Sequence, residues 1–237
     1  MDALLCRILE YLETPQYLRK ALIPMHPSLR LAGLLPPLDM PHHLRRTDDA
    51  AFRDGCTVDK PPGYKPVFGR KLGTFVDVGL GEPVKVADTV DIGSRVTVRM
   101  MTEPSIVSPS APRLEVGYNW GFTVRQASSI SKVLLECPYN GGYDLTIGTS
   151  ERGEDVAELV KEFPAFRNAI IFFGGLAGLE LTIEAEEALG LNADEAQSAF
   201  DHWVNICANQ GSRTIRTEEA LMIALARMKG SFEAMGM

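Results

Sequence analysis

The hydrophobic pattern changes its period along the chain, and the change separates three kinds of structure. Near the amino end, residues 3–13 place apolar side chains on one face of a predicted helix that stops at Thr14 and Pro15: Leu4, Leu5, Ile8 and Leu12. Apolar and polar positions then alternate with a period of two over residues 74–78, 83–86 and 95–100, with glycines between the runs. This alternation predicts short antiparallel strands in a small β module, followed by a proline- and serine-rich return linker over residues 102–113.

The second half of the chain combines helical spacing with short apolar runs. Residues 118–136 have a helical pattern with Arg125 on the polar side. Three apolar runs follow, and each leads into a loop of small or polar residues: 143–147, 169–173 and 202–206. Such runs are typical of parallel strands buried on both faces. Ligands bind at the carboxyl ends of strands in open α/β sheets, so we expect the three loops to converge on one pocket.

The last predicted helix covers residues 217–229. Thr217 is the expected N-cap, Glu218 lies in the first turn where the helix dipole favours an acid, and Gly230 is expected to end the helix. Apolar residues occupy most of its positions, which predicts a helix buried on most sides. The preceding loop holds Arg213 and Arg216 between small hydroxyl residues, and two guanidinium groups beside a helix start can receive an anion.

Charge is unevenly distributed. The 237 residues carry a net charge of −7, which argues against indiscriminate binding of polyanions. Residues 1–75 hold 11 Lys and Arg against 8 Asp and Glu, whereas the remaining residues hold 13 against 23, so the two parts carry +3 and −10. The segment 180–201 has seven acids and no basic residue. We expect it to be a solvated acidic face, which RNA, if the chain binds any, would avoid.

Several common sites lack their sequence patterns. The phosphate-binding patterns G-x-G-x-x-G and G-x-x-x-x-G-K-[ST] are absent, as is the hydrolase pattern G-x-S-x-G. The pair His42 and His43 has no third ligand at useful spacing, and the four cysteines are far apart, so we expect neither a metal site nor disulfides. No apolar run is long enough to span a membrane, and acids within residues 1–13 argue against a signal peptide, so no membrane association and no secretion are expected.

Three long motifs resemble one enzyme family. NQGSRTIRTEEA (residues 209–220), GYDLTIGTSERG (142–153) and FFGGLAGLE (172–180) are similar to the cofactor-facing segments of the SPOUT-class RNA methyltransferases, in the eukaryotic branch with a small β-barrel insert. Residues 15–45 resemble the first half of that branch. The resemblance implies an α/β fold with a parallel sheet, a C-terminal trefoil knot and an OB-like insert. The implied divisions are residues 1–66, 67–116 and 117–237.

The resemblance also implies an activity and its residues. The activity is methyl transfer from S-adenosylmethionine to RNA, with N3 of a ribosomal RNA uridine as the expected target. The expected cofactor residues are Thr149, Arg152, Gly174, Gly175, Leu176, Asn205, Ile206, Gln210, Gly211, Ser212, Thr214 and Ile215. Arg152, Arg213, Arg216 and Glu218 are the expected catalytic residues. Two alternatives stay open: Arg152 in a salt bridge with Glu151 or Glu154, and Glu218 as only a partner of the helix dipole. No sequence feature identifies a general base.

RNA contacts are expected in both halves of the chain. Arg45 and Arg46 lie in a proline-fixed loop that can present them to phosphates, and Arg125, Arg213 and Arg216 complete the expected set. Basic residues of the β module could line a nucleic-acid face or be ordinary exposed charges of a packing insert: Arg70, Lys71, Lys85, Arg95 and Arg99. By family resemblance we expect a homodimer in the nucleus, including the nucleolus, or in the cytoplasm.

Two rival functions and one question about the chain's start stay open. An RNA-binding or assembly scaffold would keep the fold without catalysis, and a small-molecule hydrolase would need a nucleophile–base pair that the sequence does not show. The opening strands of the family's sheet precede the segment that matches residues 1–13, so the chain is expected to be a shortened, less stable version of a longer protein.

Overall fold

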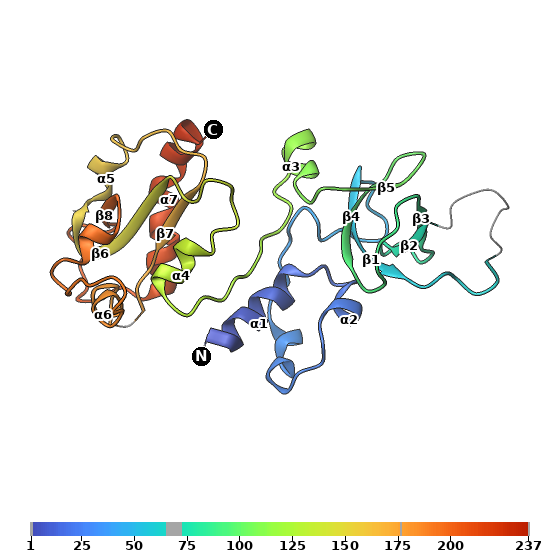
Figure 1. The fold of residues 1–237 in the computed structure, drawn as a ribbon, viewed down its shortest axis with the longest axis horizontal. Helices are drawn as coiled ribbons and strands as arrows, with labels where there is room; N and C mark the ends of the chain where they lie inside the picture. Colours follow the sequence, from blue (N-terminus) through green and yellow to red (C-terminus); the bar gives the residue numbers. More distant parts are fainter. Residues whose placement is uncertain (1, 65–72, 176, 237) are drawn as a thin grey trace. The chain divides into compact units, whose positions relative to one another are not determined.

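The computed structural model describes residues 2–64, 73–175 and 177–236, and the chain forms two compact units, residues 1–126 and 127–237 (Figure 1). Arg70, Lys71 and Leu176 lie outside the described residues. The fold is mixed α/β, with an antiparallel sheet in the first unit and a separate parallel sheet in the second. The predicted division at residues 66 and 116 stays a prediction.

The first unit begins with short helices. The predicted first helix is confirmed as α1 (Asp2–Glu13), and α2 (Arg19–Leu22) and two 3-10 turns, η1 (Pro27–Leu29) and η2 (Ala32–Leu34), follow it. Leu4 and Leu5 of α1 are exposed in this unit, whereas its last residue, Glu13, is buried.

An open five-stranded antiparallel sheet follows in the order β3-β2-β1-β4-β5. Three strands match the predicted alternation: β2 (Thr74–Asp77), β3 (Val84–Val86) and β4 (Arg95–Arg99). The central strand β1 (Phe52–Val58) was not predicted. The expected linker over residues 102–113 is wrong in part, because it contains the edge strand β5 (Ser105–Val107) and the start of α3 (Ala111–Val116). Val76, Val78, Val86 and Val98 form the core of this sheet.

A buried network of charged side chains joins α1 to the sheet. The Arg95 guanidinium donates to both carboxylate oxygens of Glu13, at 2.6 and 2.9 Å, and to Asp54. His42 Nε2 lies 3.1 Å from Glu13, and Trp120 Nε1 donates to Asp54 at 2.7 Å. Burial raises the pKa of Glu13, but hydrogen bonds from His42 and Arg95 outweigh it and lower the pKa to about 2. The Arg95 guanidinium is therefore held by two carboxylates, although the residue is exposed, and its place on a nucleic-acid face stays a prediction.

The histidine pair belongs to the same network. His42 is fully buried, and both ring nitrogens of His43 lie within 2.7 Å of carbonyl oxygens, those of Glu13 and Leu38. Burial lowers the pKa of His43, although these hydrogen bonds oppose the shift. The pair thus holds the loop before β1 against the end of α1.

The second unit has a three-stranded parallel sheet in the order β7-β6-β8, from β6 (Leu145–Asp155), β7 (Ala169–Phe172) and β8 (His202–Asn205). Alternate side chains point to opposite faces. Leu145, Ile147 and Val204 pack with α5 (Val156–Leu159) and α7 (Thr217–Met235). Phe172 and Trp203 pack with α4 (Ile130–Leu135), α6 (Glu180–Glu184) and the 3-10 turn η3 (Ala196–Ala199) on the other face. The three predicted parallel strands are confirmed.

Two helix predictions are wrong in their extent. Residues 118–129 are not helical, because Trp120 is drawn to Asp54 and Gly121 adopts φ +79. A Cβ on Gly121 would lie 2.3 Å from Glu13 Oε1, so this position requires glycine. Helix α7 does not stop at Gly230 but continues to Met235, because Phe232 and Met235 pack against the core of the unit.

Helix α7 is also less buried than predicted. Only Ala224 and Met228 are fully covered. Leu221, Met222 and Leu225 are exposed, with 74% of Met222 accessible to solvent.

Candidate active site

The carboxyl ends of the three parallel strands border one hollow in the second unit. Its volume is about 150 Å³, and its walls combine apolar side chains, small residues and polar groups from all three loops. The lining residues are Thr149, Ser150, Glu151, Phe173, Gly174, Gly175, Gly178, Asn205, Ile206, Cys207, Gln210, Ile215, Thr217 and Ala220. The structure therefore brings together most of the predicted cofactor residues.

The first loop is a bulge within β6, not a separate loop after a strand. Thr149 and Glu154 both pair with Val204 of β8, so the four residues between them leave the ladder. A Cβ on Gly153 would lie 2.5 Å from the Val204 carbonyl carbon, so only glycine lets the strand rejoin β8. The bulge places Ser150 and Glu151 at the hollow.

The second loop turns sharply after β7. A Cβ on Gly174 would lie 2.6 Å from the carbonyl carbon of Gly178, so the two glycines touch through their main chains. The Thr217 hydroxyl donates to the Gly174 carbonyl at 3.2 Å and ties this loop to the start of α7. Gly175 faces open space.

The third loop, after β8, is fixed by side chains from the other elements. The Asn205 amide donates to the Glu151 carbonyl at 2.9 Å and joins the loop to the β6 bulge. Arg227 of α7 donates to the Ile206 carbonyl at 3.0 Å. Asn209 has a left-handed backbone, φ 63, a conformation that asparagine tolerates better than most residues. These bonds hold the loop in a defined shape.

A second, larger hollow of about 710 Å³ adjoins the first. The two share residues of all three loops: Thr149, Ser150, Glu151, Gly175, Gly178, Ile215 and Thr217. The larger hollow adds charged groups, namely Arg152, Glu180, Arg216 and Glu218, together with Ala177, Leu181, Ala193 and Thr214. Its volume lies in the range of about 300–1,000 Å³ that is typical of small-molecule sites.

The charged residues of the larger hollow are weakly paired. Arg152 lies 3.4 Å from Asp194, and both side chains are exposed, so this contact holds the guanidinium only loosely. Arg216 is the N-cap of α7 in place of the predicted Thr217, and its main-chain N–H donates to Glu219. Glu218 is exposed in the first turn of the same helix.

Some predicted residues lie outside both hollows. Gly211, Ser212 and Arg213 do not line either one, although Ser212 donates to the Thr214 carbonyl and fixes the turn. Leu176 is outside the described residues. Arg45, Arg46 and Arg125 belong to the first unit.

The smaller hollow combines apolar walls, polar groups and accessible main chain, and its volume of about 150 Å³ is below the range of about 300–1,000 Å³ for a whole small-molecule site. Phe173, Ile206 and Ile215 provide apolar walls for a base, and the two glycines let a ligand approach the main chain. Sequence reasoning assigned no role to Ser150, Phe173, Gly178 and Glu180, although each lies in a motif that resembled the family. Their roles depend on contacts between loops that are far apart in sequence.

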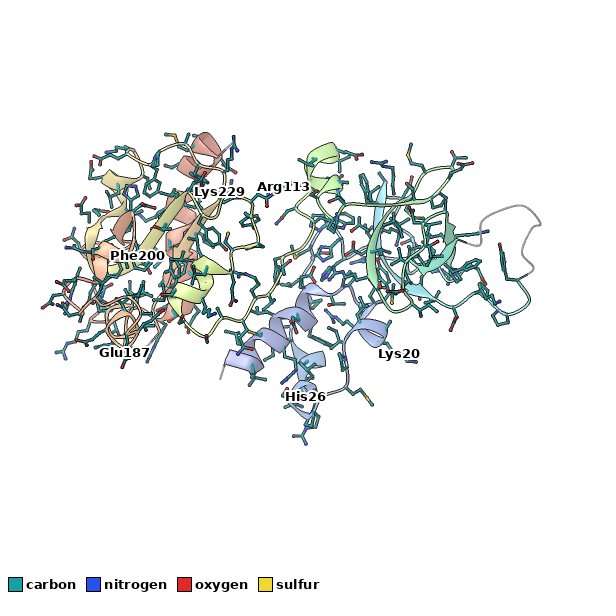
Figure 2. The ribbon with its side chains drawn as sticks, viewed as in Figure 1. Lys20, His26, Arg113, Glu187, Phe200 and Lys229 are labelled. Carbon is teal, nitrogen blue, oxygen red and sulfur yellow. The ribbon has the colours of Figure 1, made fainter. Side chains whose placement is uncertain are left out.

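The first unit holds separate hollows. One, of about 530 Å³, is lined by Arg19, His43, Arg45 and Arg46, together with Gln16, Tyr17, Pro37, Leu38, Asp39, Leu44 and Gly79. Another, of about 560 Å³, is more apolar, and its lining includes Lys20 and His26, both labelled in Figure 2. Within the described ranges, no acidic side chain pairs with Arg45 or Arg46.

Among the described residues, none of the helices has both the length and the hydrophobicity of a membrane span. Within the same residues, no group of three or more His, Cys, Asp or Glu side chains is placed to hold a metal ion.

Comparison with known proteins identifies the family. The sequence model described as "Putative RNA methyltransferase" matches residues 1–228. A human protein named "28S rRNA (uridine-N(3))-methyltransferase" is 48% identical over 95% of this chain, and a Drosophila melanogaster protein of the same name is 44% identical over 95%. The chain spans 60% of the human protein's length and 46% of the fly protein's. The match to the family model over nearly all of its length shows that this chain belongs to that RNA methyltransferase family.

Proposed function

We propose that the chain is an S-adenosylmethionine-dependent methyltransferase that acts on N3 of a uridine in ribosomal RNA. The observation that carries the proposal is the meeting of the three motif loops around one pair of adjoining hollows, in a chain that matches the family over nearly its whole length. The names of the human and fly relatives support the substrate and the atom.

The smaller hollow is the proposed cofactor site. Gly174, Gly175, Ile206 and Ile215 would receive the adenosine, and Thr149, Asn205 and Gln210 would supply polar contacts. Leu176, Gly211, Ser212 and Thr214 remain proposed cofactor residues by family resemblance. S-adenosylmethionine supplies an electrophilic methyl group on a positively charged sulfur.

The larger hollow is the proposed place of the target base. Arg152 and Arg216 line it without a strong ion pair and could stabilise negative charge that develops on the uracil ring or hold an RNA phosphate. Arg213, exposed in the loop before α7, is the third proposed RNA contact of this unit. Glu218 stays a candidate proton acceptor.

The first unit is proposed to bind the RNA backbone. The buried Arg53 guanidinium donates to the main-chain carbonyls of Arg45 and Asp48, at 2.7 and 2.6 Å. These bonds fix the turn that presents Arg45 and Arg46 beside the 530 Å³ hollow. Guanidinium groups without acidic partners are suited to phosphate contacts. Arg125 is proposed as a further contact of this unit.

A homodimer is the proposed assembly. Leu221, Met222 and Leu225 form an exposed apolar stripe along α7, next to the Thr217–Glu218 edge of the larger hollow. Such a stripe on a helix is suited to pack against the same stripe of a second copy around a two-fold axis.

The finer features of the fold also belong to this proposal. The trefoil knot in the second unit and the OB-like character of the antiparallel sheet rest on the family resemblance. Ribosomal RNA as substrate would place the protein in the nucleus or the cytoplasm.

The second candidate function is a scaffold that binds RNA without catalysis. The two functions differ in the modification of ribosomal RNA, so nucleoside mass spectrometry of rRNA from cells with and without the gene distinguishes them. The proposal expects N3-methyluridine to fall in the deleted cells and to return with the wild-type gene. An unchanged level would favour the scaffold.

A further inference from the structure

The proposed methylation of uridine N3 requires a group that accepts the N3 proton. N3 of a uracil ring carries hydrogen, and that proton has to leave when the nitrogen gains a methyl group. A group that accepts the proton must lie in the substrate hollow, close to the cofactor hollow, and be free of a strong cationic partner.

Glu180 lies in the larger hollow, in contact with a residue that both hollows share. It is the first residue of α6 and lines the larger hollow. The hydroxyl of Ser150, a residue of both hollows, donates to Glu180 Oε1 at 2.5 Å. The second oxygen, Oε2, lies 2.5 Å from the position of a Cβ on Gly178, so the absence of a side chain there leaves room for the carboxylate.

The other acids at the larger hollow are less well placed. Glu151 and Glu218 have exposed side chains, whereas Glu180 is half-buried. No described hydrogen bond fixes the carboxylate of Glu151 or Glu218. Within the described part of the chain, no Lys, Arg or His forms an ion pair with Glu180. Its carboxylate is thus positioned by Ser150 and has no basic partner among the described residues.

We infer that Glu180 is the general base of this enzyme and that Ser150 positions it. The inference rests on the proposed function and gives Glu180, in place of the candidate Glu218, the role of proton acceptor. The Ser150 hydroxyl holds Oε1, and no described hydrogen bond or ion pair occupies Oε2, which would accept the proton of the uracil N3–H group. Arg152 and Arg216 border the same hollow and can stabilise negative charge on the ring oxygens as the proton leaves.

The step is balanced in atoms and charge. The N3–H bond breaks, and its proton goes to the Glu180 carboxylate. The electron pair left on N3 forms the bond to the methyl carbon. The carbon–sulfur bond breaks with its pair on sulfur, which becomes a neutral thioether. One negative carboxylate and one positive sulfonium are consumed together, so no further reactant is needed.

The strongest competing role for Glu180 is to bind the cofactor's ammonium group. The two roles differ in the binding of S-adenosylhomocysteine, which has the same ammonium group but no methyl to transfer. If Glu180 is a general base, replacing its carboxylate with an uncharged amide leaves the affinity for S-adenosylhomocysteine unchanged. If Glu180 binds the ammonium group, the same replacement lowers that affinity.

The test uses Glu180→Gln, Glu180→Asp and Ser150→Ala in the full chain, with Glu184→Gln as the matched control. Glu184 is exposed on the same helix and lines neither hollow. Calorimetry measures S-adenosylhomocysteine binding, and the pH dependence of kcat is measured with an unmodified rRNA fragment.

Loss of a positioned general base costs about 10²–10⁴ in rate. We expect Glu180→Gln to lower kcat by that factor, to remove the acidic limb of the pH profile and to keep S-adenosylhomocysteine affinity within about twofold of wild type. Glu180→Asp should recover part of the rate, Ser150→Ala should move the acidic limb, and Glu184→Gln should match wild type.

Two results would overturn the inference while leaving the proposed function intact: full activity of Glu180→Gln, or a loss of S-adenosylhomocysteine affinity as large as its loss of kcat. A wild-type chain that binds S-adenosylhomocysteine but never methylates RNA would instead remove the proposed function, and the role of Glu180 with it.

Discussion

A single methyl group at Gly174 should damage the cofactor hollow. In the structure a Cβ at this position would lie 2.6 Å from the carbonyl carbon of Gly178 and 2.7 Å from the Leu179 nitrogen, whereas ordinary contacts begin at 3.4 Å. Both neighbours are main-chain atoms, so the loop must move as a whole. Overpacking of this kind costs about 1–3 kcal/mol. Because Gly174 and Gly178 both line the hollow, we expect Gly174→Ala to weaken S-adenosylhomocysteine binding at least about tenfold, which corresponds to about 1.4 kcal/mol.

The assay is titration calorimetry with S-adenosylhomocysteine, together with urea unfolding. Gly230→Ala is the matched control, since a Cβ there meets nothing within 4 Å and the residue lies inside α7. That change should stabilise the protein by about 0.5–1 kcal/mol and leave binding unchanged. Thr217→Val tests the same loop without a clash, because it removes the hydrogen bond to Gly174, and should weaken binding by a smaller factor. Unchanged affinity in Gly174→Ala, with a native unfolding transition, would place the cofactor outside this hollow.

Three further predictions concern other parts of the chain. The pKa of Glu13, about 2 in the folded protein against 4.5 normally, adds stability above pH 4.5 that is lost as the pH falls toward 2. Urea unfolding should show this loss in wild type and not in Glu13→Gln, and equal pH dependence of the two would contradict it. A plot of log affinity for single-stranded RNA against log salt concentration has a negative slope, and Arg45→Ala and Arg46→Ala should each make it less steep by about 1, with cofactor affinity unchanged. An unaltered slope would exclude phosphate contacts. Met222→Lys should shift the sedimentation coefficient of the protein to that of a monomer, and a wild-type monomer would remove the dimer from the proposal.

The strands around the site could be predicted because each appears in the sequence as a short apolar run followed by a loop of small or polar residues. Residues 143–147, 169–173 and 202–206 all became strands of one parallel sheet. The convergence of their loops followed from the parallel arrangement alone. The bulge was not predictable in this way, because its pairing depends on Val204, about fifty residues further along the chain.

Tertiary contacts explain the elements that the sequence pattern misplaced. Residues 118–129 have helical spacing, but Trp120 is held by Asp54 in the buried network of the first unit. Glycine commonly ends a helix, but α7 continues past Gly230 because Phe232 and Met235 pack against the core of the unit. The pair of Ser150 and Glu180 is thirty residues apart and becomes visible only when the β6 bulge meets α6.

Methyl transfer by the purified chain itself tests the proposed activity. An unmodified transcript of the large-subunit rRNA is incubated with the protein and S-adenosylmethionine that carries a labelled methyl group, and the digested nucleosides are separated by mass spectrometry. We expect label in N3-methyluridine with the wild-type chain, and loss of the label with Gly174→Ala but not with Gly230→Ala. Label in another nucleoside would correct the target atom. No transfer to RNA by a chain that binds S-adenosylhomocysteine would contradict the proposed activity.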